Sequence, residues 1–231
     1  MKRFVSLLIT STLLLSYCPL MPLYAEEDNE HSMDAVDEAI ATQYSLDEDG
    51  TIHEYSCITY DGYFEELIMT IEPNGTAQYV SKKDGQIVYT TSVSGADYNG
   101  HLDCYMAQYS IMPLCNLSDN YYTHYFLDSH SHYFPPSELS ELTSVTISVA
   151  ASIIGRKLQG PLTSGLLLSV ASYALDKFFT YNPYAATIIE NDYDVYYIGG
   201  GYYSPCYHIN VINYDSGGHV TGGGGMQYLQ P

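Results

Sequence analysis

The chain has 231 residues, of which 27 are acidic and 7 are basic, so its formal net charge at pH 7 is −20. This acidity argues against a nucleic-acid-binding protein, because seven cations cannot build the large basic patch that phosphate contact requires. With 46% hydrophobic and only 15% charged residues, the chain is not wholly disordered, and it is long enough for a hydrophobic core.

Residues 1–25 read as a secretory signal peptide. Lys2 and Arg3 form the positive start, a Leu-rich apolar run follows, and Ala25 offers a small residue at the cleavage position. A retained membrane anchor is the alternative, but the apolar run is short for one. We therefore expect a secreted or extracellular protein, with attachment to the cell envelope as a variant of that location.

Cleavage would leave four cysteines, namely Cys57, Cys104, Cys115 and Cys206. An even number in an exported chain favours two disulfides, for which three connectivities exist. We favour Cys104–Cys115, which closes a short loop, and Cys57–Cys206, which ties the two halves together. A zinc site is the alternative to disulfides for four cysteines, but the sequence contains no C-x-x-C pair of the kind that zinc sites use.

Two segments of different character follow the signal peptide. Residues 26–50 are strongly acidic and contain no Lys or Arg, which predicts a solvated leader or linker. Residues 51–136 form a predicted β-rich region. Within it, Thr51 to Ser94 alternates apolar and polar residues between glycine-containing turns, which predicts a four-stranded antiparallel meander, whereas residues 96–136 look irregular.

Residues 137–180 predict an apolar helical hairpin. Two runs without charge, Leu142–Gly155 and Leu162–Leu175, flank a break at Gly160-Pro161. Small residues recur on one stripe of each arm, which would allow the backbones to approach closely. These helix-packing candidates are Ser144, Ser148, Ser152, Gly165, Ser169 and Ser172.

The hairpin is also the candidate membrane-contacting segment. An arm from Leu142 to Leu158 would be about 26 Å long as a helix, against a bilayer core of about 30 Å. Cations at its tip could meet anionic head groups. The alternative is a hairpin buried under the β-sheet as core. The candidate membrane- or partner-contacting residues are Val145, Val149, Ile153, Arg156, Lys157, Leu166, Leu167, Val170 and Lys177.

A histidine-rich segment provides the best metal-ligand candidates, namely His124, Asp128, His130 and His132. A His-x-His pair on a strand points both rings to one face, and imidazoles with a carboxylate can bind zinc or copper. The spacing matches no metalloenzyme signature, and a polar loop flanked by tyrosines is the alternative. We expect no resident cofactor, apart from the zinc or copper that this cluster would allow. No catalytic residue is predicted, because no G-x-S-x-G motif or Cys–His setting is present.

Residues 181–231 predict a β-rich tail with many Gly and Tyr residues. Adjacent tyrosines, such as Tyr196-Tyr197 and Tyr202-Tyr203, place one ring on each face of a sheet. An exposed ring with a hydroxyl suits contact with a glycan or a protein. The alternative is that Tyr replaces the absent Trp in a half-buried β surface.

The signal peptide, the acidic leader, the Ser/Gly/Ala-rich hairpin at Leu142–Phe179 and the Tyr/Gly-rich tail together resemble large secreted bacteriocin-like proteins of Gram-positive bacteria, of the geobacillin type. The resemblance rests on layout and on the hairpin, and no motif matches residue by residue. It implies antagonism of competing bacteria through their membranes.

These observations predict an α+β fold with an antiparallel β-meander, an apolar helical hairpin and a short β tail. The expected function is non-enzymatic action on a target-cell membrane, or on a surface protein, through the hairpin. The alternative is a secreted or cell-surface interaction protein that buries the hairpin as core and uses its tyrosine-rich faces for contact. Self-association is compatible with both interpretations.

Overall fold

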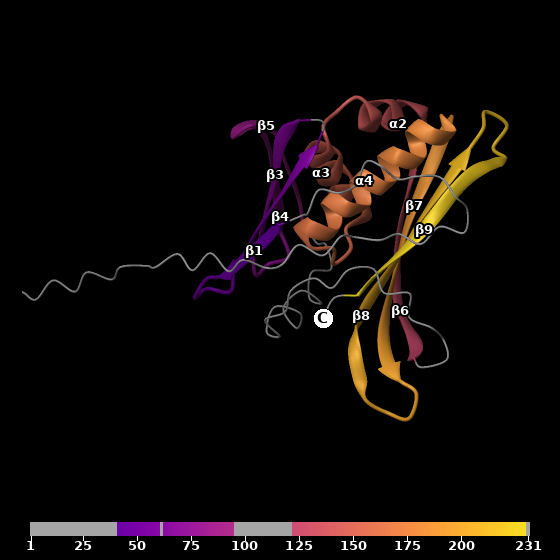
Figure 1. Cartoon of the computed structure of the whole chain (residues 1–231). Helices are drawn as coiled ribbons and strands as arrows, with labels where there is room; N and C mark the ends of the chain where they lie inside the picture. Colours follow the sequence, from indigo (N-terminus) through magenta and orange to yellow (C-terminus); the bar gives the residue numbers. More distant parts are fainter. Residues whose placement is uncertain (1–40, 61, 95–121, 230–231) are drawn as a thin grey trace, which may run out of the picture.

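The computed structural model describes residues 41–60, 62–94 and 122–229. Strands make up 54% of these residues and form two antiparallel sheets, with three short helices between them (Figure 1). The predicted signal peptide, Cys104 and Cys115 lie outside the described residues. The described part of the chain therefore has three layers, which are sheet A, the helices and sheet B.

Sheet A has five strands in sequential order. The alternation in its second strand, where Ile52, Glu54, Ser56 and Ile58 are buried, turns one face toward the helices. The predicted four-stranded meander is confirmed, and a fifth strand lies inside the segment predicted as an acidic leader. The strands are β1 (Ala41–Leu46), β2 (Ile52–Tyr60), β3 (Tyr63–Ile71), β4 (Ala77–Lys83) and β5 (Gln86–Val93).

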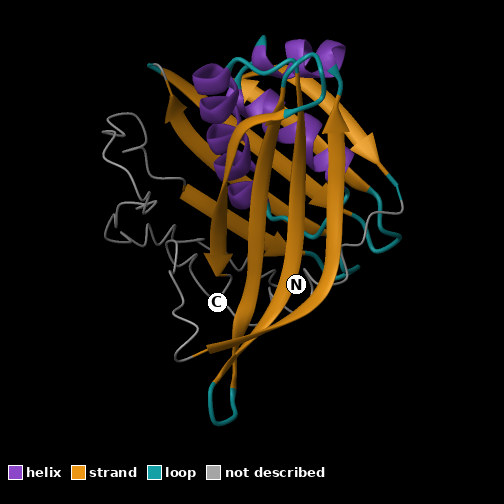
Figure 2. Ribbon diagram, turned by 90° about the vertical axis from the view of Figure 1, so that its right-hand side faces the viewer, coloured by secondary structure: helices purple, strands orange, loops and turns teal. Residues whose placement is uncertain are grey.

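Sheet B has four long strands in sequential order, and their lower ends extend beyond the helices (Figure 2). The first lies in the region predicted as irregular. Its register shifts between Phe126 and Asp128, so the side chains before and after this bulge change faces and the sequence alternation is lost. The strands are β6 (Tyr122–Phe134), β7 (Ala185–Tyr197), β8 (Tyr202–Tyr214) and β9 (Val220–Leu229).

The predicted class, α+β with an apolar helical hairpin, is wrong, because the described chain is mostly β with three short helices. These are α2 (Pro136–Thr143), α3 (Ile147–Leu158) and α4 (Ser164–Tyr181). The predicted first arm is interrupted at Ser144, whose hydroxyl donates to the Glu141 carbonyl and ends α2. None of the helices in the described ranges is long and apolar enough to cross a membrane.

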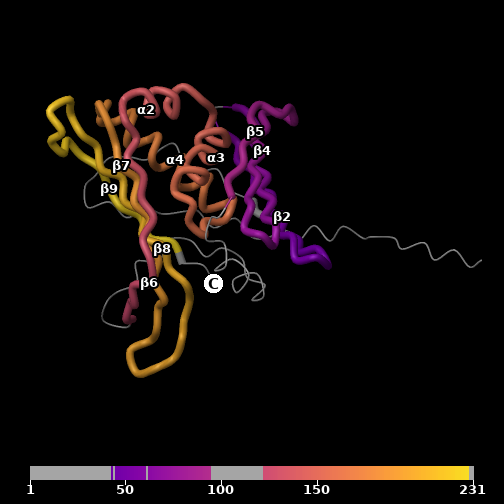
Figure 3. The backbone as a smooth tube through the Cα atoms, turned by 180° about the vertical axis from the view of Figure 1, so that it is seen from behind, coloured from indigo at the N-terminus to yellow at the C-terminus, as the bar shows by residue number. Residues whose placement is uncertain are grey.

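The runs Leu142–Gly155 and Leu162–Leu175 carry no charge because the helices that contain them are covered on two sides. Helix α3 packs on β3, β4 and β5 and also touches β6, while α4 packs on β1, β2 and β3 and on β8 and β9. The view from behind shows the same layering (Figure 3). An apolar run therefore serves here to fill the space between two sheets, which requires apolar residues around the whole helix.

Two glutamates of sheet A reach the N-termini of these helices. Glu65 is 2% exposed, and its Oε2 accepts a hydrogen bond from the Ser148 amide at 2.7 Å. Glu54 is 1% exposed, and its Oε2 accepts from the Ser164 amide at 2.5 Å. The first amides of a helix lack partners within the helix, and its N-terminus carries positive partial charge. Acidic acceptors therefore stabilise both helix starts inside the core.

Candidate functional site

The predicted membrane-contacting side chains lie mostly inside the molecule. Val149, Ile153, Leu166, Leu167 and Val170 are all buried in the core between the sheets. Val145 is half-buried and packs against the same core. A lipid contact through these residues would require the helices to leave their positions between the sheets.

Two of the three cations of the segment, Lys157 and Lys177, have acidic or aromatic neighbours. Lys157 Nζ donates to Glu138 Oε1 at 2.7 Å, whereas Arg156 is half-buried. Lys177 is 6% exposed, and its Nζ lies 3.6 Å from Asp176 Oδ2 and 5.0 Å from the centre of the Tyr173 ring. These residues therefore do not form an open basic tip.

Of the predicted helix-packing residues, Ser148 and Ser152 face sheet A, where the Ser81 hydroxyl hydrogen-bonds to the Ser148 carbonyl at 2.8 Å and to Ser152 Oγ at 2.7 Å. Gly165 and Ser169 are buried in α4, and the Ser169 hydroxyl donates to the Gly165 carbonyl. Ser144 is exposed and Ser172 is half-buried. The close contact of α3 with α4 instead uses Gly155, beside Leu167.

The structure divides the four predicted metal ligands between the two faces of sheet B. His130 and His132 share a face, as the His-x-His spacing predicts, but the bulge places His124 on the other. His132 Nε2 lies 2.7 Å from Glu138 Oε2, while His130 Nε2 lies 3.8 Å from Asp128 and 3.9 Å from Asp192. The four residues therefore do not form one site.

His124 instead meets two residues of β8. The ligand atoms of His124, Cys206 and His208 all lie within 4.8 Å of one another. The register explains this. His124 pairs with Val195 of β7, and Val195 pairs with Ser204 of β8. Cys206 is two residues after Ser204, so its side chain lies on the same face of the sheet as that of His124. The sequence feature that could have indicated this cluster is the Cys-x-His spacing at 206–208, because residues two apart on a strand place their side chains on the same face.

The pairing predicted between Cys57 and Cys206 is wrong. Cys57 lies on β2 of sheet A and Cys206 lies on β8 of sheet B, and no disulfide joins them. The helical layer keeps the two sheets apart, so the two sulfurs do not reach bonding distance. The predicted Cys104–Cys115 bridge lies outside the described residues.

A pair of acids is buried where sheet B faces the α3–α4 connection. Glu190 is 0% exposed and Asp192, two residues along β7, is 8% exposed. Burial away from water raises the pKa of Glu190 well above its usual range, and the charges of Asp192 and then Asp128 raise it further. His130, 3.9 Å from Asp192, is the nearby basic group on β6. Glu190 therefore keeps its proton to a higher pH than an exposed glutamate does.

Glu190→Gln is expected to make the protein more stable at pH 8, by about 1–3 kcal/mol, and to change little at pH 5. Since the folded pKa is raised, the folded state retains the proton longer than the unfolded chain, and wild-type stability falls as pH rises above the ordinary glutamate pKa. Glutamine keeps the shape and the donor of the protonated acid without this loss. Urea unfolding at pH 5 and pH 8 measures the difference, and an equal decline with pH in both proteins would contradict the assignment.

A tyrosine ladder lies where sheet B extends beyond the helices, and we define it as Tyr125, Tyr196 and Tyr202. The centres of the Tyr125 and Tyr196 rings are 5.3 Å apart at 90°, and those of Tyr196 and Tyr202 are 5.3 Å apart at 73°. Tyr125 is 57% exposed and Tyr202 is 54% exposed. Edge-to-face contact fixes the rings while their outer surfaces stay open to a partner.

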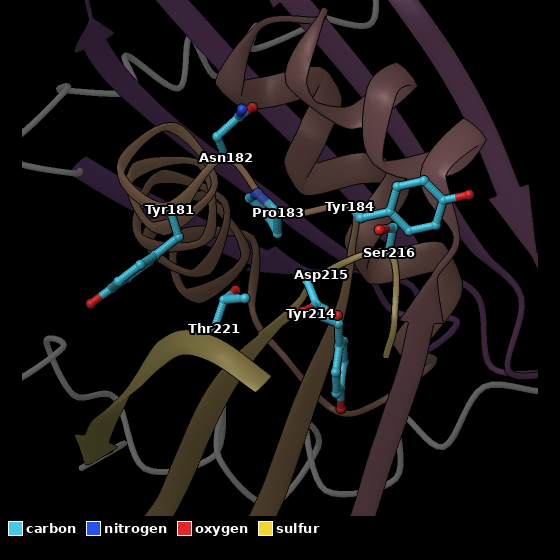
Figure 4. A pocket seen from close by; sticks show the side chains of 8 residues that line it. All are labelled: Tyr181, Asn182, Pro183, Tyr184, Tyr214, Asp215, Ser216 and Thr221. Atoms are coloured by element: carbon cyan, nitrogen blue, oxygen red, sulfur yellow. The ribbon is translucent and has the colours of Figure 1, made fainter. Parts of the chain in front are cut away.

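Two open hollows of about 400 Å³ lie at opposite ends of sheet B. One adjoins the ladder and is lined by Thr123, Tyr125, Asp194 and Tyr196 with the β7–β8 turn. The other lies between the end of α4 and the β8–β9 turn, and there the rings of Tyr181 and Tyr184 point to opposite sides of Pro183 (Figure 4). The ladder hollow is the better binding candidate, because its rings contact one another beside a carboxyl group.

Comparisons with protein-family models, curated proteins and solved structures give no match for this chain. The resemblance to bacteriocin-like proteins therefore stays a prediction from the sequence.

Proposed function

We propose that the chain is an exported, non-enzymatic binding protein that contacts a neutral glycan through the tyrosine ladder. The observation that carries the proposal is the ladder itself, three rings in edge-to-face contact on the part of sheet B that extends beyond helices α2 to α4. The helices act as core, as the second interpretation of the sequence expects. The signal peptide predicted for residues 1–25 supports the exported location.

The chemistry of the ladder favours a neutral, hydroxyl-rich ligand. Sugar rings place C–H groups on aromatic faces and hydroxyl groups near carboxylates. Tyr125 and Tyr196 supply the faces, while Asp194, opposite Tyr125 in the register, supplies the carboxyl group. No Lys or Arg follows Lys177 in the sequence, so the strands β7 to β9 offer an anionic ligand no fixed counter-charge. An acidic polymer or anionic lipid surface would meet repulsion from the net charge of −20.

Tyr125→Ala and Tyr196→Ala are each expected to weaken glycan binding about tenfold or more, because a few aromatic anchors carry most of the energy of such an interface. The probes are a dextran, a β-glucan and a mannan, and binding is measured by retardation of the mature chain in native gels that contain each polysaccharide. The matched control is Tyr133→Ala. Tyr133 is also on β6 and is 54% exposed, but it lies toward the opposite end of the strand.

Absence of retardation by every polysaccharide would contradict the proposal, as would equal losses in the Tyr125→Ala and Tyr133→Ala variants. Dye release from anionic vesicles, run in parallel, tests the membrane interpretation. Release of the dye by the mature chain, without any polysaccharide binding, would mean that the helices leave the core at a bilayer and would favour that interpretation instead.

A further inference from the structure

We propose that His124, Cys206 and His208 form a zinc site on the face of sheet B opposite the tyrosine ladder. The inference does not depend on glycan binding, since it uses different side chains and its test measures metal alone. Two imidazoles and one thiolate are a donor set that zinc accepts, with a fourth position left for water or another ligand.

The geometry of the three residues suits one ion. Their ligand atoms lie within 4.8 Å of one another, and the ring centres of His124 and His208 are 5.4 Å apart. Bonds of about 2.0 Å to nitrogen and about 2.3 Å to sulfur would draw the ligand atoms to within roughly 4 Å of one another. Small side-chain rotations would achieve this closure, because all three residues lie on one face of sheet B, His124 on β6 and the other two on β8, with β7 between them.

The surroundings provide a second, independent indication of a ligand. Both ring nitrogens of His124 are buried, and neither has a hydrogen-bond partner in the structure. Gln227, opposite His208 in the β8–β9 register, also has a buried Oε1 without a hydrogen-bond partner. Buried polar atoms are normally satisfied, so several orphaned atoms at one place indicate an ion or ordered water between them.

The neighbouring rings would shield and orient the site. Tyr193 lies over His208, with ring centres 4.3 Å apart, and its ring is also 6.0 Å from that of His124. Cys206 is 0% exposed and packs with Val195 and with the partly buried Tyr122, Tyr193 and Tyr203. An apolar shell excludes water and strengthens the attraction between a thiolate and a divalent cation. On binding, the Cys206 thiol releases its proton to solvent.

The test is a titration of the reduced, metal-free mature protein with Co²⁺ and then with Zn²⁺. We expect one equivalent of Co²⁺ to give the charge-transfer absorption of a cobalt–thiolate bond, and Zn²⁺ to displace it. Cys206→Ser should abolish the thiolate band, and His208→Gln should weaken Zn²⁺ binding by at least tenfold. Both variants are checked for folding by circular dichroism before titration.

The controls separate this site from the other candidate ligands. Cys57→Ser and His132→Gln should leave the cobalt spectrum and the affinity unchanged, because these residues lie on sheet A and on the other face of sheet B. Absence of a thiolate band in the wild type would overturn the proposal, as would retention of the band in Cys206→Ser. Peptide mapping that finds Cys206 in a disulfide in the native secreted protein would also overturn it. Tight Cu⁺ binding with no affinity for Zn²⁺ would overturn the choice of metal.

Discussion

Glu54→Ala is expected to lower the free energy of unfolding by about 3 kcal/mol. The substitution removes the buried acceptor of the Ser164 amide, 2.5 Å away, and leaves the N-terminus of α4 without its acidic partner. It also opens a cavity beside the hydrogen bond between Ser56 and Ser164, whose hydroxyl oxygens are 2.7 Å apart. Urea unfolding followed by circular dichroism measures the change.

Two further variants separate these contributions. Glu54→Gln keeps the volume and one acceptor oxygen, so we expect a loss of about 1 kcal/mol, the scale of a charge at a helix end. Glu48→Ala removes an acid from an exposed turn and should change stability by less than about 0.5 kcal/mol. If Glu54→Ala were as mild as Glu48→Ala, Glu54 would not stabilise the start of α4.

Gly160→Ala is expected to destabilise the protein by about 2–3 kcal/mol. A Cβ at this position would overlap Oε2 of Glu190 and lie 2.8 Å from its Cδ, and the Glu190 side chain is fully buried. Either the α3–α4 connection or strand β7 must move, which is the cost of overpacking a closed interior. Thermal and urea unfolding of the single variant give the magnitude.

The double variant Gly160→Ala with Glu190→Ala tests the cause. Removing the carboxyl group makes room for the methyl group, so the added cost of Gly160→Ala in this background should fall below about 1 kcal/mol. Additive losses in the double variant would show that the backbone of the connection, rather than contact with Glu190, requires glycine.

The sequence predicted strands β2 to β5 of sheet A well because the turns between them carry local signals, whereas β1 lies in the segment predicted as a leader. Asp84 and Gly85 both adopt positive φ between β4 and β5, which a two-residue hairpin requires. Strand β6 was missed because its bulge changes the exposed face in mid-strand. The sequence did not decide whether the apolar helical segment is buried as core or contacts a membrane, because an apolar run has the same composition in both environments.

The candidate sites were predicted less well because they depend on pairing between distant strands. His124 is 82 positions from Cys206 in the chain, and it reaches Cys206 only because β7 lies between β6 and β8. The grouping of His124 with His130 followed from proximity in sequence, which the bulge overrides. The sequence predicted that each tyrosine pair places one ring on each face of a sheet. Which rings contact one another depends on the register between β7 and β8, which the sequence does not indicate.

The acidic partners of the two long helices also affect how the chain must fold. Glu65 lies 83 residues before Ser148, and Glu54 lies 110 residues before Ser164. The Ser148 and Ser164 amides gain these acceptors only when sheet A has formed and meets a segment synthesised much later. Such long-range contacts slow folding, toward milliseconds to seconds for β-rich chains. During that interval the apolar runs Leu142–Gly155 and Leu162–Leu175 would be open to aggregation, so a chaperone that covers them would favour folding.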